Sequence, residues 1–242
     1  MESPDDPGPV GPRRALLAAA VGGAALLLPA CSREQGERRE AEEGVSATED
    51  LMREHGVLRR ILVVYREAAR MLRADAAGVD AGALVAAADL FRRFGEDYHE
   101  KILEEMHVFP AVERAGAPAA ALLRTLVQQH DRGREINVYL AGRGASGRIG
   151  AADVEPAAAA LESFARMYES HAAMEDTVVF QAWRRTLSED QLREAGEQFE
   201  AIERQTFKGD GFDIAVDQVG EIERRLGLGD LAGYTAPPVS AG

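Results

Sequence analysis

Two short stretches place a histidine ahead of a pair of acids and a Val-Phe run, an arrangement that suits metal binding. The first reads DYHEKILEEMHVF and the second ESHAAMEDTVVF, and their leading histidines are His99 and His171. In the second stretch Glu175 comes four residues after His171, so the two side chains lie on one face of a helix. An acid on such an apolar face is costly unless it meets a cation.

Two more histidines stand in a second repeated pattern. LMREHGVLRRI and LVQQHDRGREI share leucine, histidine, arginine and isoleucine in register, with His55 and His130 at the matched position. The chain therefore contains two copies of one helix pair. A lone histidine on an apolar face is usually a hydrogen-bonded core residue. Four in matched places, two of them followed by acids, indicate a shared metal site instead.

The acidic residues indicate which metal the site binds and how many ions it holds. Glu104 on the second helix and Glu175 on the fourth can bridge two cations between them. Imidazole with carboxylate suits iron better than a thiolate site does, and no cysteine is available for a thiolate site, because the only one is Cys31 in the N-terminal segment. A closed zinc site with four ligands would leave some of these residues unused. Two metal ions account for them better.

Hydrophobic spacing predicts the helices that must hold these residues. Apolar side chains recur with a helical period, and no stretch alternates as a strand does. Ser46 to Glu49 form a capping box, and Pro110 is expected to end or bend the second helix. The expected helices cover, to within a few residues, 48–74, 81–109, 116–140, 153–185, 188–207 and 212–226. The predicted fold is all-α, an up-down-up-down four-helix bundle with extra C-terminal helices.

The N-terminal residues match an export signal. Arg13 and Arg14 precede an uncharged apolar run over residues 15–28, and small residues follow. The paired arginines suggest the twin-arginine route. Cys31 stands where a bacterial lipobox places its lipid-bearing cysteine, although it can also be an unmodified spacer residue. We expect an exported protein, either a lipoprotein anchored on the extracytoplasmic side of the membrane through Cys31 or a periplasmic protein.

Composition supports a soluble domain behind a tether. The net charge is −13, which makes nucleic acid a poor partner because phosphate binding depends on a basic surface. The charged stretch after Cys31 has few large apolar residues and is typical of a flexible linker. The expected divisions are an export signal with a lipobox over 1–31, a linker over 32–47, the bundle over 48–187, and a C-terminal helical extension and tail over 188–242.

Taken in order, EHGVLRR, DYHEKILEEMHVFP, QQHDRG and HAAMEDTVVF resemble the hemerythrin-like, or HHE cation-binding, family. The resemblance covers about residues 48–185, and the segment after Ser188 is similar to the tail of exported bacterial members. It implies a four-helix bundle that holds two iron ions as a non-haem di-iron centre. By position, it implies a ligand set of His55, His99, His130 and His171, with Glu104 and Glu175 as bridges.

Two positions depart from the family pattern. Oxygen-carrying hemerythrins usually have a further histidine where Arg134 stands, so one iron would keep an open coordination position. Alternatively, Arg134 only faces water. On the second helix the acid expected four residues after His99 is replaced by Leu103, and Glu104 follows one residue later. A π-bulge can absorb the extra residue. The other possibility is that Glu100 is the ligand.

Other residues near the ligands have open roles. Glu104 with His107, and Glu96 with His99, match the Glu-x-x-His pair of ferritin-like bundles, but both copies fall on one helix where that architecture needs two. We expect His107 to lie outside the ligand set, near the ligands or at the mouth of the bundle.

Two acids and four tyrosines complete the set of residues near the expected ligands. Glu105 and Asp176 are expected around the ligands or in solvent, and Asp176 can also be a bridge. Most buried tyrosines simply pack, yet one beside iron can donate a hydrogen bond to a bound ligand; the four are Tyr65, Tyr98, Tyr139 and Tyr168.

The resemblance implies binding or sensing of O2, NO or iron outside the cytoplasm. The predicted ligand set resembles the iron-sensing, nitric-oxide-handling and cluster-repair branches more than the oxygen carriers. The alternative is a di-iron oxidoreductase, such as an oxidase, a peroxidase or an NO reductase. Such an enzyme would need an external electron donor, because the sequence has no Gly-rich nucleotide loop and no cysteine cluster. The sequence does not identify that redox partner.

Overall fold

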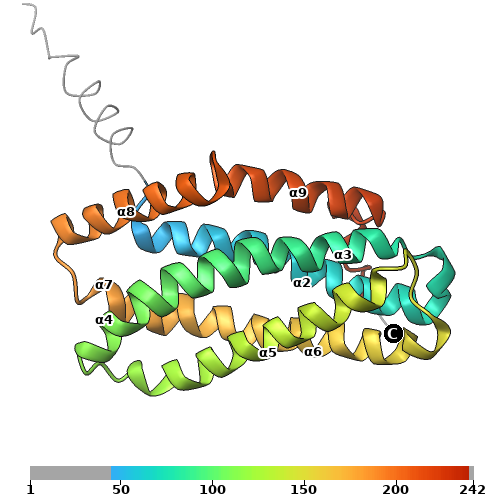
Figure 1. Ribbon diagram of the computed structural model, residues 1–242, viewed down its shortest axis with the longest axis horizontal. Coiled ribbons are helices and arrows are strands. Elements are labelled where there is room, and N and C mark those ends of the chain that lie inside the picture. Colours follow the sequence, from blue (N-terminus) through green and yellow to red (C-terminus); the bar gives the residue numbers. More distant parts are fainter. Residues whose placement is uncertain (1–44, 240–242) are drawn as a thin grey trace, which may run out of the picture. The chain divides into compact units, whose positions relative to one another are not determined.

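The computed structural model describes residues 45–239, and this part of the chain folds into helices without any strand (Figure 1). The predicted export signal with Cys31, and the predicted linker up to residue 44, lie outside the described residues. Within the described range, none of the helices is both long enough and apolar enough to cross a membrane.

The first two bundle helices follow the predicted pattern. Helix α2 spans Ala47–Asp75, and its capping box is present, with Glu49 and Ser46 each bonding the backbone N–H of the other. After the short turn η1, Ala76–Gly78, the second helix runs continuously through α3, Ala81–Leu90, the π-helix η2, Phe91–Val108, and α4, Phe109–Arg114.

Pro110 does not end the second helix, which was one of the two effects that we expected of it. It lies at the second residue of α4, just after the π-helix η2. Where π-helical bonding changes to α-helical bonding, one backbone carbonyl loses its partner in any case, so the missing N–H of proline costs little there. The helix ends instead before Gly116, which has a φ of 62° and donates its N–H to the Glu113 carbonyl at 2.9 Å.

The third and fourth helices repeat this arrangement. Helix α5 spans Ala120–Gly144, and the turn η3, Ala151–Asp153, leads to α6, Val154–Met174. A second π-helical segment, η4, Glu175–Val179, joins α6 to α7, Phe180–Arg184. Helix α2 packs against α6 and α3 packs against α5, which closes the predicted four-helix bundle.

The C-terminal helices lie along one side of the bundle (Figure 1). Helix α8 spans Glu189–Phe207 and α9 spans Gly211–Arg225, and the turn η5, Leu231–Tyr234, follows. Both helices contact α2, and Phe199 on α8 stacks on Trp183 with ring centroids 5.7 Å apart. The extension therefore belongs to the same hydrophobic core and covers the outer face of the first two bundle helices.

Candidate metal centre

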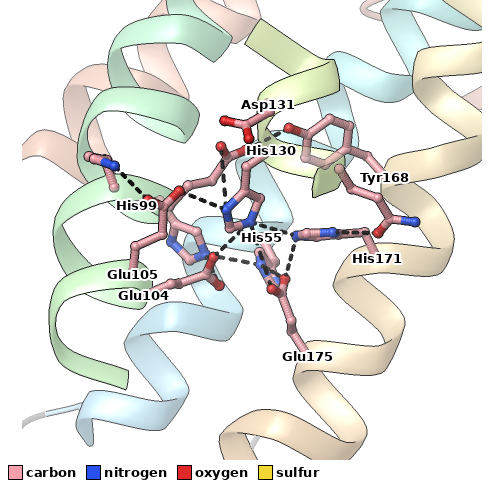
Figure 2. Close-up of polar contacts among 12 residues, drawn as sticks. His55, His99, Glu104, Glu105, His130, Asp131, Tyr168, His171 and Glu175 are labelled. Carbon is pink, nitrogen blue, oxygen red and sulfur yellow. Dashed lines mark hydrogen bonds and ion pairs between the residues drawn. The ribbon is translucent and has the colours of Figure 1, made fainter. Parts of the chain in front are cut away.

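The six residues predicted as ligands come together inside the bundle, and Figure 2 shows their side chains turned toward one another. None of them is more than 3% exposed. They come from all four bundle helices: His55 from α2, His99 and Glu104 from η2, His130 from α5, His171 from α6, and Glu175 from the first position of η4. Their ligand atoms form two overlapping groups that share Glu104, each with all of its atoms within 4.8 Å of one another.

Each of the four histidines has its Nδ1 atom bonded to an oxygen outside this cluster. A carboxylate or amide oxygen only accepts, so each Nδ1 carries a proton and each Nε2 is the ring nitrogen that faces the cluster. The acceptors are Asp176 for His55 at 2.7 Å, Glu54 for His99, Glu105 for His130 at 3.1 Å, and Gln129 for His171 at 2.9 Å.

The four Nε2 atoms meet in two pairs. In the first pair, His55 and His99, the Nε2 atoms are 3.0 Å apart, and in the second pair, His130 and His171, they are 3.1 Å apart. Two nitrogen lone pairs at this distance repel each other unless they share a proton or bind a metal ion. Two metal–nitrogen bonds of about 2.1 Å at roughly a right angle separate their nitrogens by about 3 Å, so each pair fits one metal ion.

The two carboxylates lie between the histidine pairs. One oxygen of Glu104 is 3.3 Å from His99 Nε2 and the other is 3.3 Å from His130 Nε2. Glu175 Oε2 is 3.0 Å from His171 Nε2 and 3.5 Å from His55 Nε2. All four oxygens are buried and have no hydrogen-bond donor among the described residues. Buried carboxylate oxygens are normally paired, so these four fit ligands of metal ions.

The pKa values of Glu175 and His171 fit a site that binds cations. Burial, together with the nearby charge of Glu104, raises the pKa of Glu175 well above its usual value. Burial and the positive charge of His130 lower the pKa of His171 to about 4. Without a metal ion the cluster therefore favours a proton on Glu175 and a neutral His171. Metal ions would replace such protons, because ligands bind metal in their deprotonated form.

The predicted π-bulge is confirmed in η2. A π-helix bonds residue i to residue i+5, so a five-residue spacing places two side chains on one face. This brings Glu104 onto the face of His99, and the Phe109 N–H bonds to the Glu104 carbonyl in the same register. The second π-helical segment, η4, was not predicted. It begins at Glu175, and the next residue, Asp176, reaches the outer side of His55.

Glu100, the alternative ligand, does not join the cluster. Its Oε2 atom is 4.0 Å from His130, on the Nδ1 side of the ring that faces away from the cluster. It accepts hydrogen bonds from the Tyr168 hydroxyl at 2.7 Å and from Arg134 at 3.3 Å. Arg134 also bonds to Glu105 at 2.8 Å and is only 27% exposed. Geometry thus favours Glu104 over Glu100, and Arg134 does more than face water.

Gly133 was missed in the sequence, yet it makes room for Tyr168. A Cβ atom at this position would lie 2.1 Å from the Tyr168 hydroxyl oxygen. We expect Gly133→Ala to displace the tyrosine from Glu100 and to lower the free energy of unfolding by about 1–3 kcal/mol through overpacking, partly offset by up to about 1 kcal/mol of helix propensity. Urea denaturation measures the change. Gly142→Ala on the same helix meets no atom within 4 Å and should be neutral or stabilising, and equal losses in both variants would contradict the steric argument.

The remaining predicted residues belong to neither ligand group. His107 is half-buried, packs on Phe199 with ring centroids 5.7 Å apart, and belongs to neither ligand group. Glu96 accepts from Asn137 at 2.6 Å, so the ferritin-like ligand pairs do not form. The tyrosines make four different contacts: Tyr65 donates to Asn137, Tyr98 to Glu54 and Tyr168 to Glu100, while Tyr139 lies under the Arg143 guanidinium.

A small cavity adjoins the cluster. Its volume is about 10 Å³, close to the minimum that holds one water molecule. Its polar lining includes Glu100, Arg59 and four of the predicted ligands, and its apolar lining includes Leu58 and Leu62. The space beside the cluster is therefore about the size of one water molecule.

Comparison with known proteins agrees with this geometry. The family model described as hemerythrin HHE cation binding domain matches residues 46–183. Uncharacterized proteins of Mycobacterium bovis and Mycobacterium tuberculosis are 42% identical over 240 residues, which cover 95% of this chain and 92% of each relative. No solved structure matches the chain.

Proposed function

The chain belongs to the hemerythrin HHE cation-binding family, and we propose that it holds two iron ions and binds a small diatomic ligand such as O2 or NO. The four buried oxygens of Glu104 and Glu175 carry this proposal. They lie between two histidine pairs, each spaced as the ligands of one metal ion. Each metal position would thus have two imidazoles and a share of two carboxylates.

The donor set supports iron as the metal. Among the described residues it consists of imidazole and carboxylate groups, and the one cysteine of the chain, Cys31, lies outside them. In helical bundles, carboxylates and histidines that project inward from facing helices are typical of di-iron sites. When bound, iron supplies reversible ligand binding and redox chemistry. The chain's own residues hold the metal, shape the cavity and place proton donors beside it.

The size of the cavity supports a diatomic ligand. Its space for about one water-sized molecule lies against both histidine pairs through His55, His99 and His171. Leu58 and Leu62 of α2 form part of its apolar lining. An organic substrate would need a larger opening next to the cluster.

A di-iron oxidoreductase is the second candidate, and the pair formed by Tyr168 and Glu100 favours it. Both residues line the cavity, and the Tyr168 hydroxyl donates to Glu100 at 2.7 Å. A hydroxyl next to a carboxylate can hold a proton and pass it to a reduced ligand. Turnover would need electrons from an external donor.

Metal analysis and ligand spectra test the proposal. The purified full chain should contain about two iron ions, and absorption spectra of the reduced protein should change when O2 or NO is added. A reversible change supports a binding or sensing protein, whereas irreversible oxidation or consumption of NO supports the oxidoreductase. As a control, the double variant His55→Ala/His130→Ala lacks one imidazole of each pair and should lose both ions. Zinc alone, or no metal, would reject the di-iron proposal.

We also propose that this centre acts outside the cytoplasm. The proposal rests on the export pattern of residues 1–31 and on Cys31 in a lipobox-like position, followed by a linker. Cys31→Ser should move the protein from the membrane fraction to the soluble fraction without changing its metal content. A protein that is already soluble with Cys31 intact would contradict the lipid anchor.

A further inference from the structure

The hydrogen bonds around the four histidines follow the internal repeat of the chain. In each half, the arginine four residues after the first histidine bonds to the acid that holds that histidine. In the first half Arg59 binds Asp176, which accepts from His55. In the second half Arg134 binds Glu105, which accepts from His130. Two of the four histidines thus have equivalent carboxylate partners.

The symmetry breaks at the other two histidines. The residue just before the first histidine of each half reaches across to the second histidine of the same half. In the first half this residue is Glu54, which accepts from His99 and from the Tyr98 hydroxyl. In the second half it is Gln129, which accepts from His171 at 2.9 Å. A carboxylate thus supports the first pair where a neutral amide supports the second.

This difference acts directly on the ring that would bind the metal. A carboxylate that accepts the Nδ1 proton raises the basicity of the imidazole and strengthens its Nε2 as a ligand. A hydrogen bond to a charged acceptor is about twice as strong as one to a neutral acceptor. Glu54 is completely buried, so water screens its charge little.

The surrounding charges act in the same direction. Near the first pair, Arg59 is the one cation that bonds to Glu54 or Asp176 among the described residues. Near the second pair, Glu105 is bonded to both Lys101 and Arg134, and Arg134 also bonds to Glu100 and to the exposed Asp131. Glu100 and Glu105 near the second pair are thus each bonded to a lysine or an arginine, whereas the buried Glu54 near the first pair is bonded to neither among the described residues.

We infer that the two metal positions are not equivalent and that the position at the first pair, His55 and His99, binds its ion more tightly. Glu54 and Gln129 are the positioning residues that set the difference. The inference rests on the proposed function, because it needs two metal positions. Loss of such an outer hydrogen bond typically costs about 10–100-fold in metal affinity, so we expect dissociation constants about tenfold or more apart.

Stepwise addition of Fe²⁺ to the metal-free full chain, without oxygen and at constant pH, tests the inference by calorimetry. Wild type should bind in two steps, and His171→Ala, which leaves the first pair intact, should keep the tighter step. His99→Ala should keep the weaker one. Two equal steps in wild type would overturn the inference while leaving the proposed function in place. Absence of any Fe²⁺ binding would overturn the proposed function itself.

Exchange of the two positioning residues makes the test independent of folding defects. Glu54→Gln should weaken the tighter step about tenfold or more, and Gln129→Glu should strengthen the weaker step. Gln129 is partly exposed, so a carboxylate is tolerated there, and damage to the fold cannot produce a gain in affinity. The double exchange should restore two separate steps with their order reversed. Steps that Gln129→Glu leaves unchanged would overturn the inference.

Discussion

Glu104→Ala is expected to remove iron from both metal positions, whereas Glu100→Ala is expected to leave both filled. Glu104 directs one oxygen toward each histidine pair at the same distance, 3.3 Å, so each position loses a ligand when it is removed. Glu100 lies on the outer side of His130 and bonds to Tyr168 and Arg134. Its loss should lower stability by about 1–3 kcal/mol through the groups left without a partner, not remove metal.

The two variants form a matched pair, because each replaces a buried glutamate of the same helix with alanine. Iron per chain is measured by elemental analysis after dialysis, and far-UV circular dichroism reports whether the helices remain. Loss of iron in Glu100→Ala together with retention in Glu104→Ala would reverse the assignment. Equal retention in both variants would mean that neither carboxylate is a ligand.

Both the fold and the clustering of the six ligand residues could be predicted from the sequence, because both depend on helical periodicity. Histidines and acids on the apolar faces of four helices must meet when those faces pack together. The one-residue offset between His99 and Glu104 also predicted a π-bulge, since a regular α-helix would turn Glu104 away from His99. Backbone regularity and the repeat led to these predictions, and the resemblance to the hemerythrin-like family implied the same ligand set.

The sequence did not predict which side chains form hydrogen bonds between helices. Neighbouring residues on an α-helix point about 100° apart, so Glu54 cannot share the direction of His55. It faces the next helix instead, where it meets His99. Nothing in the local sequence tells which acid of a charged helix finds such a partner. The signal was present only in the repeat, where Glu54 and Gln129 occupy the same position before a histidine.

Glu175→Gln is expected to make the metal-free protein more stable and to abolish its stabilisation by iron. Burial raises the pKa of Glu175 above its usual 4.5, so the folded chain holds this proton more tightly than the unfolded chain. Stability is therefore lost as the pH rises from 4.5 through the folded pKa. Glutamine carries no such proton, and its amide can donate to the Nε2 atoms of His171 or His55. The gain should be about 1–3 kcal/mol and should grow from acidic to neutral pH.

With iron bound, wild type should be more stable than Glu175→Gln. An ion present at about 1,000 times its dissociation constant stabilises the folded state by about 4 kcal/mol, and wild type should show a gain of this order. The neutral amide in Glu175→Gln cannot supply the negative charge that two cations require, so the variant should gain little. Thermal unfolding with and without Fe²⁺, in the absence of oxygen, measures both effects. If Glu175→Gln is less stable than wild type without metal, Glu175 stabilises the fold itself. If the variant is more stable than wild type without metal and less stable with iron, the buried acid lowers the stability of the metal-free chain and is needed for metal binding.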